Sequence, residues 1–423
     1  MYRTARTRKI DQTGTFKGAH EIYSNRSIIK YQPSSKGIIA IVSDPFDSNE
    51  PLATERIKYR FDSRGLLRKK NKFILIGEKI ETLVEGDFDV TDVSTQGEKI
   101  VFSSTANDDD HELQDIYSLD ANSKAISKIT EGTGTVSAIC LSPEGKVAYV
   151  GHRQGYIPWA VDKLIFPETG TSVEIGMNAS SSVLSDLFVS DVQKLLYDSG
   201  KYYLIGQTGG SASIFSYDGA VKRLTDLKLV VREFSVKSGK LAYVYTSSEK
   251  PSVLFFGKEL DLNPEIKGAT PHRIEADGKE AWLLLSHSKH PNILSIHGGP
   301  HSAYGYAYSI EFNFLLQNGF NVIFGNPTGS GGYGEDFARE CVGDWCADIL
   351  PQLKHVGFLL LLRFRLHSSR FGRFCRNPLP SLKVASVLNV ASLGVSVLPL
   401  HASLSACNRD MPLFHSSIQT AVW

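Results

Sequence analysis

Two glycine-rich runs hold the residues whose types and spacing are best suited to chemistry. Residues 296–301 read Ile-His-Gly-Gly-Pro-His, and residues 326–334 read Asn-Pro-Thr-Gly-Ser-Gly-Gly-Tyr-Gly. Glycine lets a backbone pass close to a reacting carbonyl because it carries no Cβ that would clash. The same runs contain a serine and a histidine, the residue types of nucleophilic and acid–base catalysis.

A catalytic serine on a strand-to-helix elbow requires the pattern G-x-S-x-G, followed along the chain by an acid and a histidine. This pattern is absent from the 423 residues. Ser330 lies in a glycine-rich turn without a strand–elbow–helix context, so we interpret it as a turn residue. Ser392 is the weak candidate nucleophile, because Val390 stands where the elbow needs glycine and would obstruct the strained turn. No catalytic residue is therefore assigned.

A repeated pattern of turns and short strands precedes these runs. Between about residues 38 and 262, a turn with glycine comes before an apolar strand, as at residues 97, 145, 200 and 239. Second hairpins follow in several units, and the spacing of about 40 to 55 residues is typical of propeller blades. The pattern predicts a partial β-propeller of about 4–5 blades. A β-sandwich with chance spacing is the alternative.

The pattern changes after Asn263. Strands are expected at 280–285, 292–296 and 321–324, and helices at 312–317 and 335–339. Strands that alternate with helices indicate an α/β sheet. The predicted organisation is an unassigned segment at 1–36, a partial β-propeller at 37–265, the N-terminal part of an α/β-hydrolase domain at 266–350, and an irregular, poorly ordered tail at 351–423.

Three segments together resemble the propeller-bearing members of the prolyl oligopeptidase family of serine peptidases, in particular the acylaminoacyl-peptidase and dipeptidyl-peptidase types. They are residues 56–62 with Gly65, the His297–Pro300 turn, and the run at 326–334 followed by Gly343-Asp344-Trp345. The resemblance extends from about Gly37 to Trp345. Thr328 stands where the family usually has arginine.

The resemblance implies a serine peptidase that acts on short or N-acylated peptides. It places Gly298 and Gly299 on the oxyanion-hole side, where the N–H of Gly299 would face the oxyanion and the second donor would follow the nucleophile. His297 is interpreted as a packing or hydrogen-bonding residue, since the triad base of the family lies near the C-terminus. The residues that support the motif are His297, Pro300, Asn326, Pro327, Gly329, Gly332, Tyr333 and Gly334.

Charge divides the chain into two unlike parts. Residues 1–348 have 38 basic and 44 acidic residues, a balance of −6, whereas the remainder has eight basic residues and Asp410, a balance of +7. The overall +1 gives no indication of a nucleic-acid partner. The apolar run at 358–362 is far shorter than the roughly 20 residues of a membrane span. We expect no membrane partner.

Cysteine usage indicates a reducing compartment. The five cysteines are an odd number without CxxC spacing, which argues against a disulfide framework and a zinc site. No cofactor or metal is expected. The basic start at residues 1–9 has no apolar run after it, so a cytoplasmic location is favoured over secretion. An organelle presequence stays the alternative.

The tail determines the functional prediction. Beyond Trp345 the family pattern ends, and the favoured interpretation is that an out-of-frame or rearranged sequence replaces the segments with the nucleophile, aspartate and histidine. We therefore predict a truncated peptidase-family protein that is catalytically inactive as it stands. The alternatives are a non-catalytic propeller that binds peptides or a partner protein, and one part of a split peptidase completed by another polypeptide.

Overall fold

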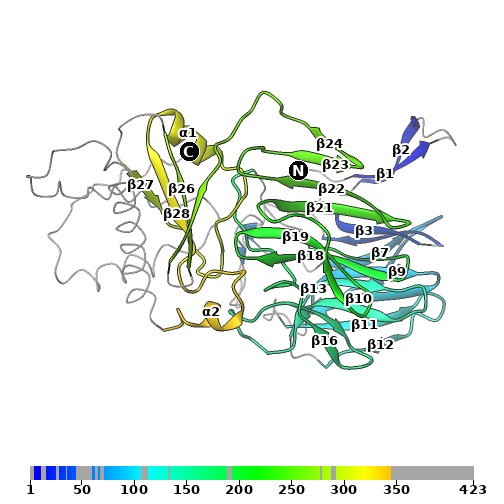
Figure 1. Ribbon diagram of the computed structural model, residues 1–423. Coiled ribbons are helices and arrows are strands. Elements are labelled where there is room, and N and C mark those ends of the chain that lie inside the picture. The colour runs from blue at the N-terminus through cyan, green and yellow to red at the C-terminus, as the bar shows by residue number, and fades with distance from the viewer. Residues whose placement is uncertain are drawn as a thin grey trace, which may run out of the picture.

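The computed structural model describes residues 4–10, 16–24, 28–34, 36–43, 60–61, 65–66, 71–105, 113–131, 134–187, 193–276, 279–286 and 292–343. Five consecutive groups of four antiparallel strands dominate this part of the chain (Figure 1). Blade 1 consists of β3 (Ile28–Ser34), β4 (Gly37–Val42), β7 (Lys72–Ile76) and β8 (Ile80–Val84). Blade 2 consists of β9 (Val90–Gln96), β10 (Lys99–Thr105), β11 (Gln114–Asp120) and β12 (Ile126–Lys128).

The next three groups repeat this plan. Blade 3 consists of β13 (Thr135–Leu141), β14 (Val147–His152), β15 (Lys163–Phe166) and β16 (Thr171–Val173). Blade 4 consists of β17 (Leu195–Asp198), β18 (Lys201–Thr208), β19 (Ser211–Tyr217) and β20 (Val221–Arg223). Blade 5 consists of β21 (Val230–Lys237), β22 (Lys240–Thr246), β23 (Val253–Phe256) and β24 (Lys258–Asp261). A parallel bridge from Ala212 to Val230 joins blades 4 and 5.

Two short ladders lie outside the blades. Strand β1 (Thr4–Ile10) pairs antiparallel with β2 (Phe16–Ser24), and β5 (Arg60–Phe61) pairs with β6 (Gly65–Leu66). The second ladder includes Arg60, Phe61 and Gly65 of the 56–62 segment and its glycine, one of the three segments that carry the family resemblance. Candidate nucleophile Ser392, the Asp344-Trp345 pair and the tail all lie outside the described residues.

The glycine-marked turns of the sequence are the hairpins between the first and second strands of the blades. Ser199 and Gly200 have φ of 50° and 82°, and Ser238 and Gly239 have φ of 50° and 73°. Positive φ values at both residues of a two-residue loop are typical of a type I′ turn, whose twist matches that of the two paired strands. Each of these turns lies inside a blade. Blade 1 therefore begins before Gly37, at β3, which lies in the 1–36 segment that the sequence analysis left unassigned.

Each inner blade buries both of its faces, because successive side chains of its strands pack in turn against the preceding and the following blade. In β10, Ile100 and Phe102 pack against blade 1 in a cluster with Phe73, whereas Val101 between them packs against blade 3 with Ile139. A strand with both faces covered reads as a continuous apolar run instead of an alternating one. The predicted partial β-propeller is confirmed, with five blades among the described residues.

Polar side chains fix the blades to one another. The Asp92 carboxylate of β9 is 3% exposed, forms an ion pair with Lys30 of blade 1, and accepts the main-chain N–H of Ile139 in blade 3 at 2.8 Å. The Asp198 carboxylate of blade 4 likewise accepts the N–H groups of Ser238 and Gly239 in blade 5, at 3.0 and 2.7 Å. Carboxylates therefore bridge neighbouring blades, and between blades 4 and 5 they add to the main-chain bridge from Ala212 to Val230.

A mixed sheet follows the propeller (Figure 1). Its strands are β25 (His272–Ala276), β26 (Lys279–Leu284), β27 (Asn292–Ser295) and β28 (Asn321–Gly325), in the order β25-β26-β28-β27, with β27 and β28 parallel. Helix α1 (Ile310–Gln317) lies between β27 and β28 in the sequence, and α2 (Glu335–Arg339) follows β28. The predicted α/β elements are confirmed, with α1 two residues longer at its start.

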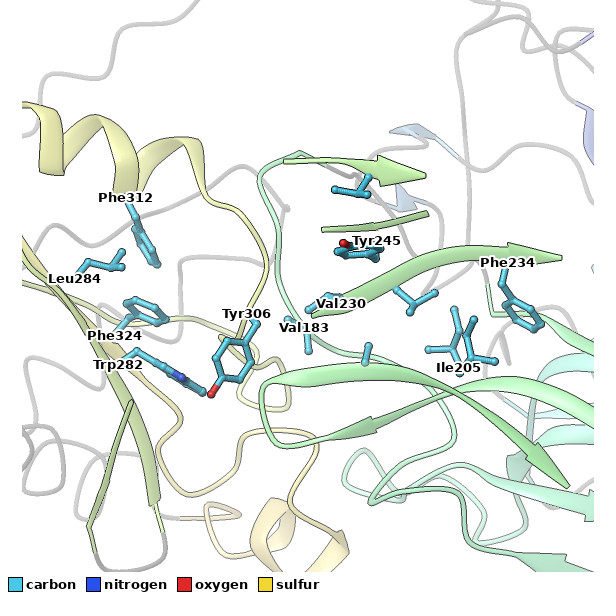
Figure 2. Close-up of a cluster of buried hydrophobic side chains, with 14 of the residues drawn as sticks. Val183, Ile205, Val230, Phe234, Tyr245, Trp282, Leu284, Tyr306, Phe312 and Phe324 are labelled. Atoms are coloured by element: carbon cyan, nitrogen blue, oxygen red, sulfur yellow. The ribbon is translucent and has the colours of Figure 1, made fainter. Parts of the chain in front are cut away.

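One hydrophobic cluster belongs to both parts of the molecule. Figure 2 shows Tyr306 between Trp282 of β26 and the propeller residue Val183. Trp282 is fully buried and stacks on Phe324 of β28, with ring centroids 5.5 Å apart. Phe312 connects α1 to the same cluster, with its ring centroid 4.8 Å from that of Phe324. The sheet and the propeller thus share a core.

The Asp92 bridge should be a major contributor to propeller stability. We expect Asp92→Ala to lower the free energy of unfolding by about 2 to 4 kcal/mol, because it leaves the buried N–H of Ile139 and the Lys30 ammonium without their acceptor. Urea denaturation measures this change. Glu81→Ala is the control, since Glu81 is 42% exposed and its pair with Lys124 should be worth less than about 1 kcal/mol. Equal losses in the two variants would contradict the bridging role.

Candidate active site: the oxyanion-side turn

The Gly298-Gly299 turn follows the last residues of β27 and is exposed. Gly299 has a φ of 139°, and a Cβ at this position would lie 2.7 Å from the Ser302 nitrogen, so the turn requires glycine there. A Cβ on Gly298 would meet no atom within 4 Å. The Gly299–Pro300 peptide bond is cis. Within the described part of the chain, the amide N–H groups of Gly298 and Gly299 make no hydrogen bond.

His297 lies behind this turn as a buried residue, 9% exposed. Its Nδ1 is 3.0 Å from the Gly298 oxygen and its Nε2 is 3.1 Å from the Ser330 Oγ. The imidazole also packs edge-to-face on Tyr304. Burial lowers the pKa of His297 below its ordinary value of 6.5, because the charged form would lose its water. The side chain therefore links the two glycine-rich runs as a neutral ring.

The second run begins with Asn326, which is 2% exposed at the end of β28. Its Oδ1 accepts the main-chain N–H of Tyr304 at 2.7 Å, and its Nδ2 donates to the Tyr304 carbonyl at 2.8 Å. The Nδ2 group also donates to the Tyr333 hydroxyl oxygen at 2.8 Å. That hydroxyl donates to Glu280 of β26 at 2.6 Å, and Glu280 forms an ion pair with Arg273. Burial, with the nearby Glu280 charge, raises the pKa of Tyr333.

The remaining residues of this run are held by their backbones. The Ser330 Oγ lies 2.7 Å from the Pro327 carbonyl oxygen, and Ser330 is fully buried, so its hydroxyl cannot reach a substrate in this conformation. Gly329 has a φ of 102°, and a Cβ there would lie 2.5 Å from the Cys341 sulfur. Gly334, with a φ of 93°, is the N-cap residue that precedes α2. Pro300 is only partly buried, beside Gly299.

The propeller contacts the second glycine-rich run, residues 326–334, through blade 4. Gln207 of β18 donates its Nε2 to the Gly331 carbonyl at 3.1 Å, and the Gly209 N–H donates to the Gly332 carbonyl at 2.7 Å. A Cβ on Gly332 would lie 2.3 Å from the Gln207 Nε2. These contacts were missed by reasoning from the sequence alone. A pair of glycines at 209–210, directly after a strand, is the signal that could have indicated them.

The segment between blades 3 and 4 makes a second junction. Ala303 donates its N–H to the Ser182 carbonyl at 3.0 Å and accepts the N–H of Leu184 at 2.8 Å. The Asp186 carboxylate accepts the Ser309 hydroxyl at 2.9 Å and the Glu311 N–H at 3.0 Å at the start of α1. The chain that follows the oxyanion-side turn is therefore paired with the propeller over several residues.

Comparison with known proteins identifies this architecture. A sequence model described as the acylaminoacyl-peptidase N-terminal beta-propeller domain matches residues 2–251, more than half of the chain. The chain belongs to this family. The resemblance to the prolyl oligopeptidase family is thereby confirmed.

Individual peptidases are also similar to parts of this chain. The uncharacterized peptidase YuxL of Bacillus subtilis (strain 168) is 31% identical over 176 residues, which cover 35% of this chain and 26% of the relative. Dipeptidyl-peptidase 5 of Arthroderma otae is 30% identical over 150 residues, which cover 32% of this chain and 20% of the relative. These matches therefore span only about a quarter and a fifth of the relatives' length.

A solved structure shares the fold. An acylaminoacyl peptidase in complex with Z-Gly-Gly-Phe-chloromethyl ketone superposes with a TM-score of 0.66 at 19% sequence identity. The superposition covers 85% of this chain and 60% of that one. The peptidase-family propeller and the first part of its α/β domain are thus present in this chain.

The described ranges hold neither a metal-binding cluster nor a membrane-spanning helix. No group of three His, Cys, Asp or Glu side chains there is placed to hold a metal ion. Neither helix of the same part of the chain has the length and apolar character to cross a bilayer.

Asn326 should be important for the stability of this peptidase-family fold. Asn326→Ala leaves the N–H and carbonyl of Tyr304 without partners, and each unsatisfied buried group costs about 1 to 3 kcal/mol. We expect the free energy of unfolding to fall by about 3 kcal/mol or more in denaturant titrations. Asn318→Ala is the matched control, because Asn318 donates an exposed hydrogen bond to the Phe314 carbonyl. If Asn326→Ala lowers the free energy of unfolding no more than Asn318→Ala does, the stabilising role of the Asn326 hydrogen bonds to Tyr304 is excluded.

The lowered pKa of His297 predicts an acid-dependent loss of stability. When the pH falls below about 6.5, the unfolded chain takes up a proton at this histidine before the folded chain does. The free energy of unfolding should therefore decrease from about pH 7.5 to about pH 5.5, and His297→Asn should remove part of that decrease. Denaturant titrations at several pH values measure the free energy of unfolding of each variant. His272→Asn is the control, because His272 is exposed. An unchanged pH dependence in His297→Asn would be the contrary result.

Proposed function

We propose that this chain provides the propeller and the oxyanion-side half of the active site of a peptidase of the acylaminoacyl or dipeptidyl type. The observation that carries the proposal is the exposed Gly298-Gly299 turn, whose amide groups are unpaired within the described residues while the structure behind it is fixed. Main-chain N–H groups held in this way stabilise a negative charge that develops on a carbonyl oxygen without having to reorganise.

The substrates in this proposal are short or N-acylated peptides. One relative is named a dipeptidyl-peptidase, and one similar structure holds a peptidyl chloromethyl ketone. Blade 4 supports an access role for the propeller, because its β18–β19 turn contacts the glycine-rich run beside the oxyanion-side turn. A peptide that reaches Gly299 would therefore pass close to the propeller.

Peptide cleavage would need a catalytic nucleophile on an elbow, which the 423-residue sequence lacks. The elbow pattern is missing from it, and the Ser330 hydroxyl is buried between the Pro327 carbonyl and the His297 ring. Loss of a triad nucleophile lowers turnover by about 10⁶. The chain alone would then bind peptides at most, and a second polypeptide with the elbow, acid and histidine would complete the site.

The domain organisation belongs to the same proposal. The propeller would end near residue 265, residues 266–350 would form the start of the peptidase domain, and residues 351–423 would be the non-homologous tail. Cys140 and Cys341 are free thiols in the described part of the chain, which supports a reducing, cytoplasmic location.

A peptidase assay tests the proposal. We expect no turnover of N-acetylaminoacyl or dipeptidyl chromogenic substrates by the full chain alone, because the sequence lacks the elbow pattern and Ser330 is buried. Turnover that disappears in Ser392→Ala would overturn this expectation.

A complementation assay tests the role of Gly299. The full chain is mixed with a polypeptide that carries the elbow, acid and histidine of a peptidase of this family, and turnover should appear. Gly299→Ala keeps the N–H but places a Cβ 2.7 Å from the Ser302 nitrogen at a φ of 139°, which displaces the donor. It should then lower kcat by up to about 10² to 10³, the effect of losing one oxyanion donor. Gly298→Ala is the matched control, because its Cβ would meet open space. Equal effects of the two substitutions would refute the assignment of Gly299.

A further inference from the structure

The orientation of the Gly299 N–H is fixed by the carbonyl on the other side of the same peptide. The Gly298 oxygen lies 3.0 Å from the Nδ1 atom of buried His297. The peptide between Gly298 and Gly299 is trans, since the cis bond of this turn follows Gly299. In a planar trans peptide the N–H points opposite to the carbonyl. An oxygen directed inward at His297 therefore directs the Gly299 N–H outward.

Only one protonation pattern of a neutral His297 makes this contact a hydrogen bond. A carbonyl oxygen accepts only, so Nδ1 must carry the hydrogen, and Nε2 of the neutral ring must then accept. The Ser330 Oγ, 3.1 Å from Nε2, can donate its proton there. In the other tautomer the Nδ1 lone pair would face the Gly298 oxygen and repel it.

Ser330 has two possible acceptors for one proton. Its Oγ lies 2.7 Å from the Pro327 carbonyl and 3.1 Å from the His297 Nε2. A doubly protonated His297 could donate to both the Gly298 oxygen and the Ser330 Oγ, but burial opposes that charge and lowers the pKa of the ring. With neutral His297, the contact to Gly298 therefore requires that Ser330 donate to the ring.

We propose that His297 is a positioning residue that holds the Gly298–Gly299 peptide with the Gly299 N–H facing outward, and that Ser330 selects the required tautomer. The inference rests on the proposed role of Gly299 as an oxyanion donor. It assigns a task to the serine of the second run, which the proposed function leaves unused. A hydrogen bond to the Gly298 carbonyl also polarises the peptide, which makes the Gly299 N–H a stronger donor.

The small number of Gly-Gly pairs in the sequence allows the Gly298–Gly299 peptide to be observed selectively by NMR. Gly-Gly pairs occur at 209–210, 298–299 and 331–332. In full-length protein labelled with glycine that carries ¹³C at the carbonyl and ¹⁵N at the amide, a spectrum that correlates an amide with the preceding carbonyl contains only these three peptides. The 209–210 peptide serves as the internal reference, since Gly332 lies close to Ser330 in the chain.

Three substitutions give distinct expectations. His297→Asn places an amide nitrogen near the position of Nδ1, so the signal of the 298–299 peptide should stay close to its wild-type position. His297→Gln places its nitrogen nearer to Nε2 and should move the Gly298 carbonyl signal upfield, as a lost hydrogen bond does. Ser330→Ala should move the same signal, although Ser330 does not contact Gly298. Ser213→Ala is the matched control, because Ser213 is also buried and donates to a main-chain carbonyl.

The tautomer is measured independently in the unsubstituted protein. With ¹⁵N-labelled histidine, the ring signals that disappear in His297→Asn should show a protonated Nδ1 and an unprotonated Nε2. A protonated Nε2, or a 298–299 signal that responds equally to His297→Asn and His297→Gln, would overturn the proposal. Both readouts concern the resting protein. A correct tautomer without restored turnover in the complementation assay would thus reject the proposed function and leave the positioning role intact.

Discussion

A single buried carboxamide determines how the two parts of the molecule meet. Gln207 of β18 is fully buried, its Nε2 donates to the carbonyls of Gly209 and Gly331, and its Oε1 accepts both the N–H and the hydroxyl of Ser182. An amide buried without partners costs about 2 to 7 kcal/mol. All its partners are present only when the blade-4 turn, the segment before blade 4 and the glycine-rich run come together. The location of that run is therefore set by the propeller.

Close backbone contact gives this junction its specificity. A Cβ on Gly305 would lie 2.0 Å from the Gly210 oxygen, and the Tyr306 N–H donates to that oxygen at 2.9 Å. Main chain packed on main chain has no side-chain rotamers with which to adapt, so the geometry is stiff. Ala303 connects the oxyanion-side turn to this rigid junction, because it pairs with the Ser182–Leu184 segment. A catalytic donor benefits from such rigidity because it must not reorganise during the reaction.

The sequence predicted what depends on local chemistry and missed what depends on distant contacts. Gly200 and Gly239 marked their hairpins because positive φ is a local requirement, and the 312–317 helix followed from its apolar pattern. The sheet of blade 1 was predicted to start too late, since its Gly37 turn lies within the blade. Gln207 and Glu280 could not be predicted as parts of the site, because a polar residue in a strand gives no sign of its partner across the chain.

Asn326 stands in for a neighbouring strand. Its carboxamide satisfies both main-chain polar groups of Tyr304, as a paired residue in a sheet would. The described stretch between β27 and α1 is thus joined to the sheet by a side chain in place of a strand ladder, while Ala303 and Tyr306 hold it to the propeller. A sequence change in this loop would therefore shift no strand register in the sheet, provided that Asn326 and these propeller contacts are kept.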